Sequence, residues 1–107
     1  TVNDLKLKQA SRLKIVKLLL KQGAEVNYQD DSGMTPIYQA VVDQDLAVVQ
    51  ALLAAGANAK IKNELGYNAI DAIQSTVNRY KNLNLAKASA VAKFRKSQAE
   101  RIWSLLN

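Results

Sequence analysis

The sequence predicts an all-α fold in which helix-turn-helix units stack into a solenoid, with short hairpin loops between the repeats. The first observation is that the segment from Val16 to Ile73 repeats itself, with position i matching position i + 33. The second is that apolar residues within each unit follow helical spacing. The third is a glycine directly after each apolar stripe, where a helix commonly ends. A repeat of this length cannot bury its apolar face alone and stacks on neighbouring copies, which creates an extended surface.

The second helix of each unit is the clearest element. Leu13, Val16 and Leu20 lie on one helical face, and Leu46, Val49 and Leu53 show the same pattern in the next copy. The pairs related by the repeat offset are Val16/Val49, Leu19/Leu52, Leu20/Leu53, Gly23/Gly56, Ala24/Ala57, Gly33/Gly66 and Ile37/Ile70. Both apolar stripes are therefore expected to pack in one continuous core.

The first helix of the middle unit has its own boundary signals. Thr35 supplies a hydroxyl cap, and Pro36 is suited to the first helical position because it has no N–H there to leave unpaired. Residues 43–45, with the sequence Asp-Gln-Asp, are expected to form the short turn between the two helices. Asp30 begins a second turn by its composition, in the loop that precedes Thr35.

Several motifs together carry a family resemblance. They are Leu19-Leu20-x-x-Gly23-Ala24-x-Val26-Asn27, Asp30-x-x-Gly33-x-Thr35-Pro36-Ile37-Tyr38-x-Ala40, Val48-Val49-x-x-Leu52-Leu53-x-x-Gly56-Ala57-Asn58 and Asn68-Ala69-Ile70-Asp71-Ala72-Ile73. Over about residues 3–78, rejoined at 102–106, the chain resembles the ankyrin repeat. Tyr38 and Asp71 depart from the family pattern, because they stand where it usually has histidine.

The resemblance implies one ankyrin repeat domain over residues 1–107. We expect a degenerate N-terminal repeat at 1–29, a full repeat at 30–62 and a C-terminal capping repeat at 63–107. The first copy is expected to begin at about Asn3 with a separate first helix that carries Lys6, Lys8 and Arg12 on its solvated face. Both end units are interpreted as caps, which stacked repeats need for solubility.

An insertion of about 20 residues is predicted in the last unit, at about residues 78–97, since 102–106 aligns with 49–53 at an offset of 53. We expect the preceding helix to reach Lys81 and a turn to follow at 82–84. One long or kinked helix is then expected from Leu85 to the end of the chain, because this stretch is rich in helix formers and contains neither glycine nor proline.

The insertion carries the whole net charge of +6. Its basic residues are Arg79, Lys81, Lys87, Lys93, Arg95 and Lys96, with no acidic residue among them. One interpretation is a solvated helix face on the capping repeat, with the basic stems lying over apolar surface. The alternatives are an acidic protein partner, nucleic acid or an anionic membrane. Nucleic acid is disfavoured because the charge is spread out and no base-reading motif is present.

The resemblance places a partner on the concave side of the solenoid, which the loop tips and the first helices form. The matching positions are Asp31, Ser32, Met34, Val42, Asp43, Glu64, Leu65, Tyr67, Ser75 and Thr76. Among them Met34, Leu65 and Tyr67 are apolar or aromatic, as the anchors at the centre of an interface tend to be. Local packing of one loop on the next is the alternative role for each of these three.

Composition argues against catalysis. The chain has no cysteine and no histidine, which removes thiol chemistry, the commonest general base and the commonest metal ligand. Asp30-Asp31 and Asp43-x-Asp45 are carboxylate pairs at turns, where aspartate serves local hydrogen bonding. We expect no enzyme activity, cofactor, metal or small-molecule substrate.

The predicted function is binding of a protein partner through the concave surface. The alternative is an electrostatic adaptor that binds nucleic acid or anionic membrane through the basic insertion. A third interpretation is a spacer or terminal cap in a longer chain, because the sequence begins at Thr1 and not at methionine. A cytoplasmic protein is expected, or one in the host cytosol if the chain belongs to a secreted bacterial effector, a hypothesis from its Lys, Asn and Gln content.

Overall fold

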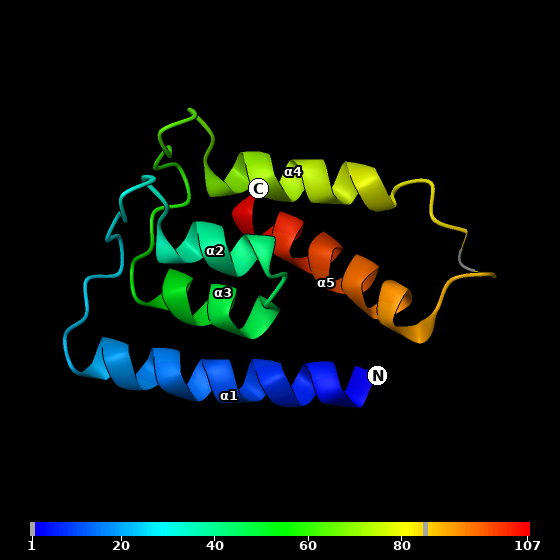
Figure 1. The fold of residues 1–107 in the computed structure, drawn as a ribbon, viewed down its shortest axis with the longest axis horizontal. Helices are drawn as coiled ribbons and strands as arrows, with labels where there is room; N and C mark the ends of the chain where they lie inside the picture. The colour runs from blue at the N-terminus through cyan, green and yellow to red at the C-terminus, as the bar shows by residue number, and fades with distance from the viewer. Residues whose placement is uncertain (1, 85) are drawn as a thin grey trace.

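The computed structural model describes residues 2–84 and 86–107, which form helices and loops without a β-strand. The helices are α1 (Val2–Lys21), α2 (Pro36–Val42), α3 (Leu46–Ala54), α4 (Ala69–Tyr80) and α5 (Ala90–Leu106). Figure 1 shows α2 and α4 side by side, with α3 beside α2 and α5 running obliquely below α4. The all-α prediction is confirmed.

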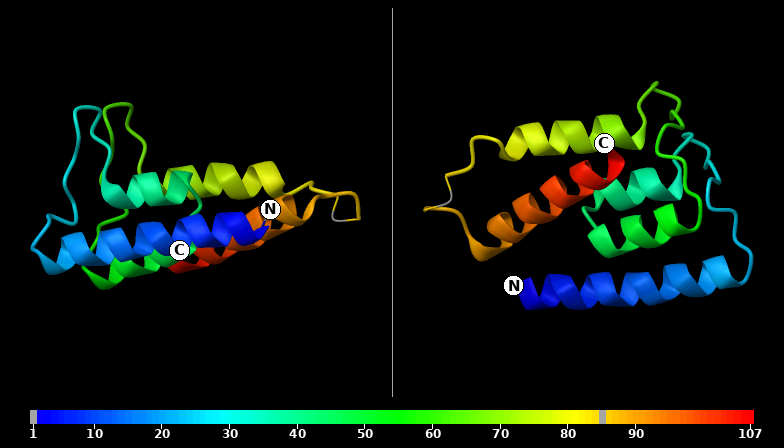
Figure 2. Two further views of the ribbon diagram at one scale, coloured as in Figure 1. Left: turned by 60° about the horizontal axis from the view of Figure 1, so that its bottom comes forward. Right: turned by 180° about the vertical axis from the view of Figure 1, so that it is seen from behind.

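The helices form two layers. In the outer layer α1 packs against α3, and α3 packs against α5; in the inner layer α2 packs against α4. Contacts of α2 with α3 and of α4 with α5 join the layers. The loops 22–35 and 55–68 rise together on the side of α2 and α4, as Figure 2 shows in its left view. The inner helices and the loops therefore bound the same face of the molecule.

Both inner helices begin at side-chain caps. The Thr35 hydroxyl accepts a hydrogen bond from the backbone N–H of Tyr38, as the sequence predicts. In the next unit the Asn68 side chain accepts from the N–H of Asp71, whose carboxylate accepts in turn from the N–H of Asn68, each at 2.9 Å. This capping box satisfies two donors that would otherwise lack partners at the helix start. Helix α4 therefore has a side-chain cap at its start, as α2 does, although Asn68-Ala69 stands in place of Thr-Pro.

The core lies between the two layers. Its buried apolar side chains come from α2, α3, α4 and α5, whereas the apolar residues that α1 contributes are half-buried. The buried apolar residues are Ile37, Ala40, Val41, Leu46, Val48, Val49, Leu52, Ala69, Ile73, Ala99 and Ile102. Leu13, Val16 and Leu20 of α1 pack against this cluster and remain half-buried. The predicted stripes therefore meet in one core, with α1 at its edge.

The prediction of two helices in the first copy is wrong. Residues 2–21 form the single helix α1, so Lys6, Lys8 and Arg12 lie on the same helix as Leu13 and Val16. The reason lies at the positions that match the Asp-Gln-Asp turn of the middle unit. Those positions hold Ala-Ser-Arg at 10–12, and this segment has neither a glycine nor an aspartate to stop the helix.

The predicted start of the last helix is also wrong. Helix α5 begins at Ala90, where the Ser89 hydroxyl accepts from the N–H of Ala92 at 3.1 Å. The preceding loop contains a local turn in which the Asn84 side chain accepts from the N–H of Ala86. These polar side chains compete with helical pairing of the backbone. Leu85, the predicted first residue, lies outside the described residues.

The turn between α2 and α3 buries a carboxylate. Asp45 is 1% exposed, and its Oδ1 accepts from the N–H of Val48 to cap α3. Its Oδ2 has no hydrogen-bond donor among the described residues, and Nη1 of Arg12 lies 4.0 Å away. Burial raises the pKa of Asp45 above its ordinary value of 3.8, although the bond from Val48 and the charge of Arg12 oppose this shift. Burial thus makes the ionised form of the Asp45 carboxylate less favourable in the folded protein than in water.

Replacing Asp45 by asparagine should keep the helix cap and remove the buried charge. Because the folded state holds the Asp45 proton more tightly than the unfolded state, its contribution to stability falls as pH rises from 3.8 through the raised folded pKa. Urea unfolding at pH 3 and pH 7 should therefore show Asp45→Asn gaining stability relative to the wild type as pH increases. Asp45→Ala also loses the cap and should lose about 1 kcal/mol relative to Asp45→Asn. An unchanged difference between wild type and Asp45→Asn across this pH range would contradict the assignment.

Two further findings concern the described residues as a whole. None of their helices combines the length and the apolar character needed to cross a membrane. Among the same residues, no three histidine, cysteine, aspartate or glutamate side chains gather in an arrangement that could hold a metal ion.

Candidate functional site

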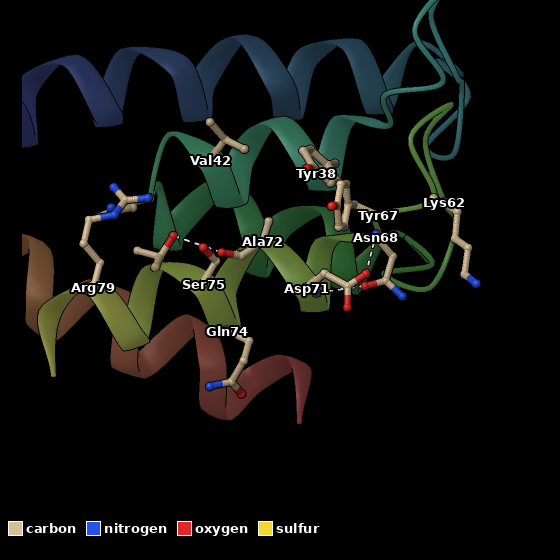
Figure 3. Close-up of a pocket in the computed structure, with 13 residues that line it drawn as sticks. Tyr38, Val42, Lys62, Tyr67, Asn68, Asp71, Ala72, Gln74, Ser75 and Arg79 are labelled. Carbon is tan, nitrogen blue, oxygen red and sulfur yellow. Dashed lines mark hydrogen bonds between the residues drawn. The ribbon is translucent and has the colours of Figure 1, made fainter.

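A hollow of about 1000 Å³ lies on the inner face of the molecule. We call it the inner groove, and Figure 3 shows its lining residues as sticks. Its lining comes from α2 and the turn that follows it, from α4 and from the loop between α3 and α4. The residues are Tyr38, Val42, Gln44, Lys62, Gly66, Tyr67, Asn68, Asp71, Ala72, Gln74, Ser75, Thr76 and Arg79.

Two tyrosines form the end of the inner groove nearest the loops. Tyr38 extends from α2 and Tyr67 from the loop before α4, and Figure 3 draws their rings next to each other. Tyr38 packs against the core and is half-buried, whereas Tyr67 is 54% exposed. The backbone of Tyr67 is fixed because its N–H donates to Asn63 Oδ1 at 3.1 Å. An exposed ring on a fixed backbone can bury a large area against a partner at a small loss of entropy.

Charged side chains stand at both ends of the inner groove. Lys62 lies beyond the tyrosines at the loop end, and Arg79 reaches from the far end of α4 toward the end of α2 (Figure 3). Between them lies Asp71, whose carboxylate is engaged in the capping box with Asn68. The inner groove thus presents two cations separated by aromatic and apolar surface, with one carboxylate already hydrogen-bonded within the chain.

Hydrogen bonds between the two loops hold them in register. The Gln29 amide donates to the carbonyls of Gly33 and Lys62, each at 3.1 Å. The N–H of Glu64 donates to the carbonyl of Ser32 at 3.1 Å. Such a cross-linked pair of loops is preformed before any partner arrives, so its ordering adds little to the entropy lost on binding.

Each loop is also braced internally by one side chain. Asp30 Oδ1 accepts from the N–H groups of Ser32 and Met34, each at 2.9 Å. Asn63, the matching residue of the next repeat, accepts from Leu65 and Tyr67 in the same way. An amide thus substitutes for a carboxylate because both offer the acceptor that this turn needs. The two loops consequently have equivalent shapes.

The predicted contact residues divide into three groups. Val42, Tyr67, Ser75 and Thr76 line the inner groove; the hydroxyl of Thr76, which is buried, donates to the carbonyl of Ala72. On the exposed loop tips lie Asp31, Ser32, Glu64 and Leu65. The third group is half-buried and already bonded: Met34 accepts from Asn63 Nδ2 at 3.6 Å, and Asp43 accepts from Gln39 Nε2 at 3.3 Å. The structure therefore gathers four of the ten positions at one groove.

Other residues of the inner groove were absent from the sequence-derived set. Tyr38 and Asp71 are the two positions where the chain departs from the family histidine, and that departure was the available signal. Lys62 is a surface-facing position of the third copy by the same repeat register, and it does line the inner groove, whereas Asn68 begins the helix motif and was interpreted only as part of it. Gln74 was likewise missed, and its side chain turns toward α5, where its Oε1 accepts from Trp103 Nε1 at 2.8 Å.

The six residues of the predicted basic patch lie on α4, on α5 and in the loop between them. Arg79 lines the inner groove, Lys87 lies in the loop after α4, and Lys93 is exposed on α5. Arg95 and Lys96 are half-buried on α5, where Lys96 lies 3.9 Å from the Glu100 carboxylate. Lys81 is exposed at the end of α4. Of the six basic residues, Arg79 is the one in the lining of the inner groove.

Two polar side chains of the inner groove hold the backbone of α4. The Asp71 carboxylate caps α4, and the Thr76 hydroxyl bonds a carbonyl one turn earlier.

Comparison with known proteins identifies the repeats. The family model of ankyrin repeats matches residues 7–88 with 3 copies. No curated protein matches the chain by sequence. Ankyrin repeats generally act as protein–protein interaction modules and are typically without enzymatic activity. With the match spanning most of its length, the chain belongs to the ankyrin repeat family.

Proposed function

We propose that this domain binds a protein partner in the inner groove. The observation that supports this proposal best is the combination of a hollow of about 1000 Å³ with an exposed aromatic anchor, Tyr67, at 54% exposure. Val42, at the end of α2, adds a second exposed apolar side chain, at 50% exposure. Exposed apolar groups in a recess, surrounded by polar groups, are typical of an interface centre.

The charges define the kind of segment that fits. Lys62 and Arg79 lie at opposite ends of the groove, so an extended segment between them can place a carboxylate at one end or both. Its central side chains would be apolar or aromatic, because they meet Val42 and the two tyrosines. Arg79 favours a planar carboxylate pairing, since guanidinium donates two parallel hydrogen bonds.

The rigid loops support binding by reducing its entropic cost. Hydrogen bonds from Gln29 and Glu64 join the two loops and hold the loop that carries Lys62 and Tyr67 in place. A preformed surface leaves more of the contact free energy for affinity. The domain would thus act by rigid presentation, with no chemical step of its own.

The partner is to be found by capture on the immobilised domain at physiological salt, with nuclease present, followed by measurement of its affinity by titration calorimetry. Val42→Ala combined with Tyr67→Ala should weaken binding by at least about 30-fold, the loss expected for an interface anchor. The matched control is Tyr28→Ala, since Tyr28 is 58% exposed and lies outside the groove lining. Equal affinities for the double variant and the wild type would refute the proposal.

The same experiment separates the electrostatic alternative. Lys81→Gln, Lys87→Gln and Lys93→Gln together remove exposed cations that lie outside the inner groove. This triple variant should bind the captured protein as the wild type does. A capture that nuclease abolishes, with affinity falling steeply between low and physiological salt, would instead support nucleic-acid binding.

A further inference from the structure

A second recess lies at the open edge of the stack, where α1 meets α2 and α3. We call it the edge cleft; it has a volume of about 330 Å³ and an almost wholly apolar lining. The apolar residues of α1 that line it are Ile15, Val16, Leu19 and Leu20. Ala40 and Pro36 of α2, with Val48 and Leu52 of α3, complete its floor. The edge cleft and the inner groove thus lie on different sides of α2.

The internal repeat shows what the edge cleft lacks. Ile15 and Leu19 are 60% and 50% exposed, whereas Val48 and Leu52, the matching residues of the next repeat, are 6% and 3% exposed. In the second unit α2 belongs to the inner layer and packs on the α3 helix that carries these two positions. The first unit has the outer helix α1 without an inner helix beside it. The exposure of Ile15 and Leu19 therefore marks a place where, among the described residues, the first unit has no counterpart of α2.

The chain's own first residues do not fit this place. By the repeat offset, residues 3–9 correspond to α2, yet they continue straight along α1. Asp4 and Lys8 occupy the positions at which α2 buries Ile37 and Val41. Burial of either charge in an apolar site is strongly unfavourable because the charge loses its hydration. The helix that completes the unit must therefore have a different sequence.

The polar residues of the edge cleft indicate the charge of that helix. Glu25, Asp43 and Asp45 line it, against the single cation Arg12. Arg12 Nη1 lies 3.9 Å from Asp43 Oδ2 and 4.0 Å from Asp45 Oδ2, which are longer than hydrogen bonds. Asp45 Oδ2 is buried without a donor among the described residues. An incoming ammonium or guanidinium group would give Asp45 Oδ2 the donor it lacks and would pair with Asp43 Oδ2, while Asp43 Oδ1 keeps its bond from Gln39.

We propose that the edge cleft binds an amphipathic helix of a partner protein, with its apolar face on Ile15 and Leu19 and a basic side chain directed at Asp43 and Asp45. The helix needs about two turns to match the 7-residue length of α2. Such a helix would complete the first repeat in trans, in the manner of helix-in-groove recognition. This site is independent of the inner groove, so one domain can hold two segments at once.

The test uses two defined helical peptides of about 14 residues, each with a side-chain lactam because free helices of this length are marginal in water. Both carry the same face of isoleucine, valine and alanine; the edges of that face carry lysine in one peptide and glutamate in the other. Titration into ¹⁵N-labelled protein should shift amide signals at the edge cleft, such as those of Ile15, Leu19 and Ala24. The lysine peptide should bind at least about tenfold more tightly than the glutamate peptide.

Leu19→Asp provides the matched variant, since a residue 50% exposed tolerates a charge without loss of the fold. It should abolish the shifts, whereas Tyr67→Ala in the inner groove should leave them unchanged. Equal affinities for the two peptides, or shifts confined to the inner groove, would overturn the proposal. Sedimentation that detects a dimer which Leu19→Asp dissociates would also overturn it, because a second copy of the chain would then be the occupant.

Discussion

Replacing Ile37 by alanine should lower the free energy of unfolding by about 2–5 kcal/mol, because it opens a cavity in the covered centre of the stack. Ile37 is 0% exposed and lies in the core cluster with Val41 and Val49. A short solenoid has few neighbouring interfaces to absorb such a loss. Thermal unfolding followed by helical circular dichroism should show a melting temperature lowered by about 10 °C or more.

Ile70→Ala is the matched control for this experiment. Ile70 occupies the matching position of the next repeat, but it is only half-buried in α4. Its replacement should destabilise the domain by clearly less than that of Ile37, because less apolar surface returns to water. Equal losses for the two variants would contradict the packing described for the middle unit.

Replacing Gly33 by alanine should destabilise the domain by about 2–4 kcal/mol, from backbone strain and from overpacking together. Gly33 has φ = +79°, and a Cβ built there would lie 2.9 Å from the N of Glu64 and 3.0 Å from the Cα of Asn63. Those atoms are backbone of the neighbouring loop, so relief requires the two loops to separate. Urea unfolding measures the loss of stability. If the Glu64 amide of the Gly33→Ala variant were as well protected from hydrogen exchange as in the wild type, the loops would not have separated and the explanation would be wrong.

Gly66→Ala separates strain from contact. Gly66 has φ = +86°, but no atom lies within 4 Å of a Cβ built there. Its replacement should therefore carry only the left-handed strain of about 1–2 kcal/mol. If Gly33→Ala and Gly66→Ala proved equally destabilising, close approach of the loops would not be the reason for glycine at position 33.

Much of the middle of the fold follows from local sequence. Thr35-Pro36 begins α2, and Asp45 begins α3, because these side chains satisfy backbone donors within three residues. Gly23 and Gly56 follow the predicted stripes with φ of 90° and 93°. Signals of this kind act over one turn, so they can be interpreted without knowledge of the rest of the chain.

The two wrong predictions arose where a local signal was weak or absent. Residues 10–12 lack a stop signal, so the separate first helix expected from the repeat analogy continues without a break through α1. Helix propensity favoured a start at Leu85, yet the cap at Ser89 determines where α5 begins. Propensity amounts to tenths of a kcal/mol per residue, which a cap of about 1 kcal/mol outweighs.

The candidate sites were only partly predictable for a different reason. The repeat register predicted Val42, Tyr67, Ser75 and Thr76 on the inner face, and all four line the inner groove. It could not show that Arg79 of the predicted basic patch also lines this groove. Position along a helix gives a direction, but the lining of a groove depends on how two helices and a loop are placed around it.

By itself the sequence determined the helical repeat, its register, the caps of the middle unit and the family. These properties depend on neighbours within a few residues or on a period that is visible in the chain. Only the tertiary structure decided that α1 is one helix, that Asp45 is buried and that Ile15 and Leu19 remain uncovered. Burial depends on which helices pack against a residue, and residues distant in the chain determine that packing.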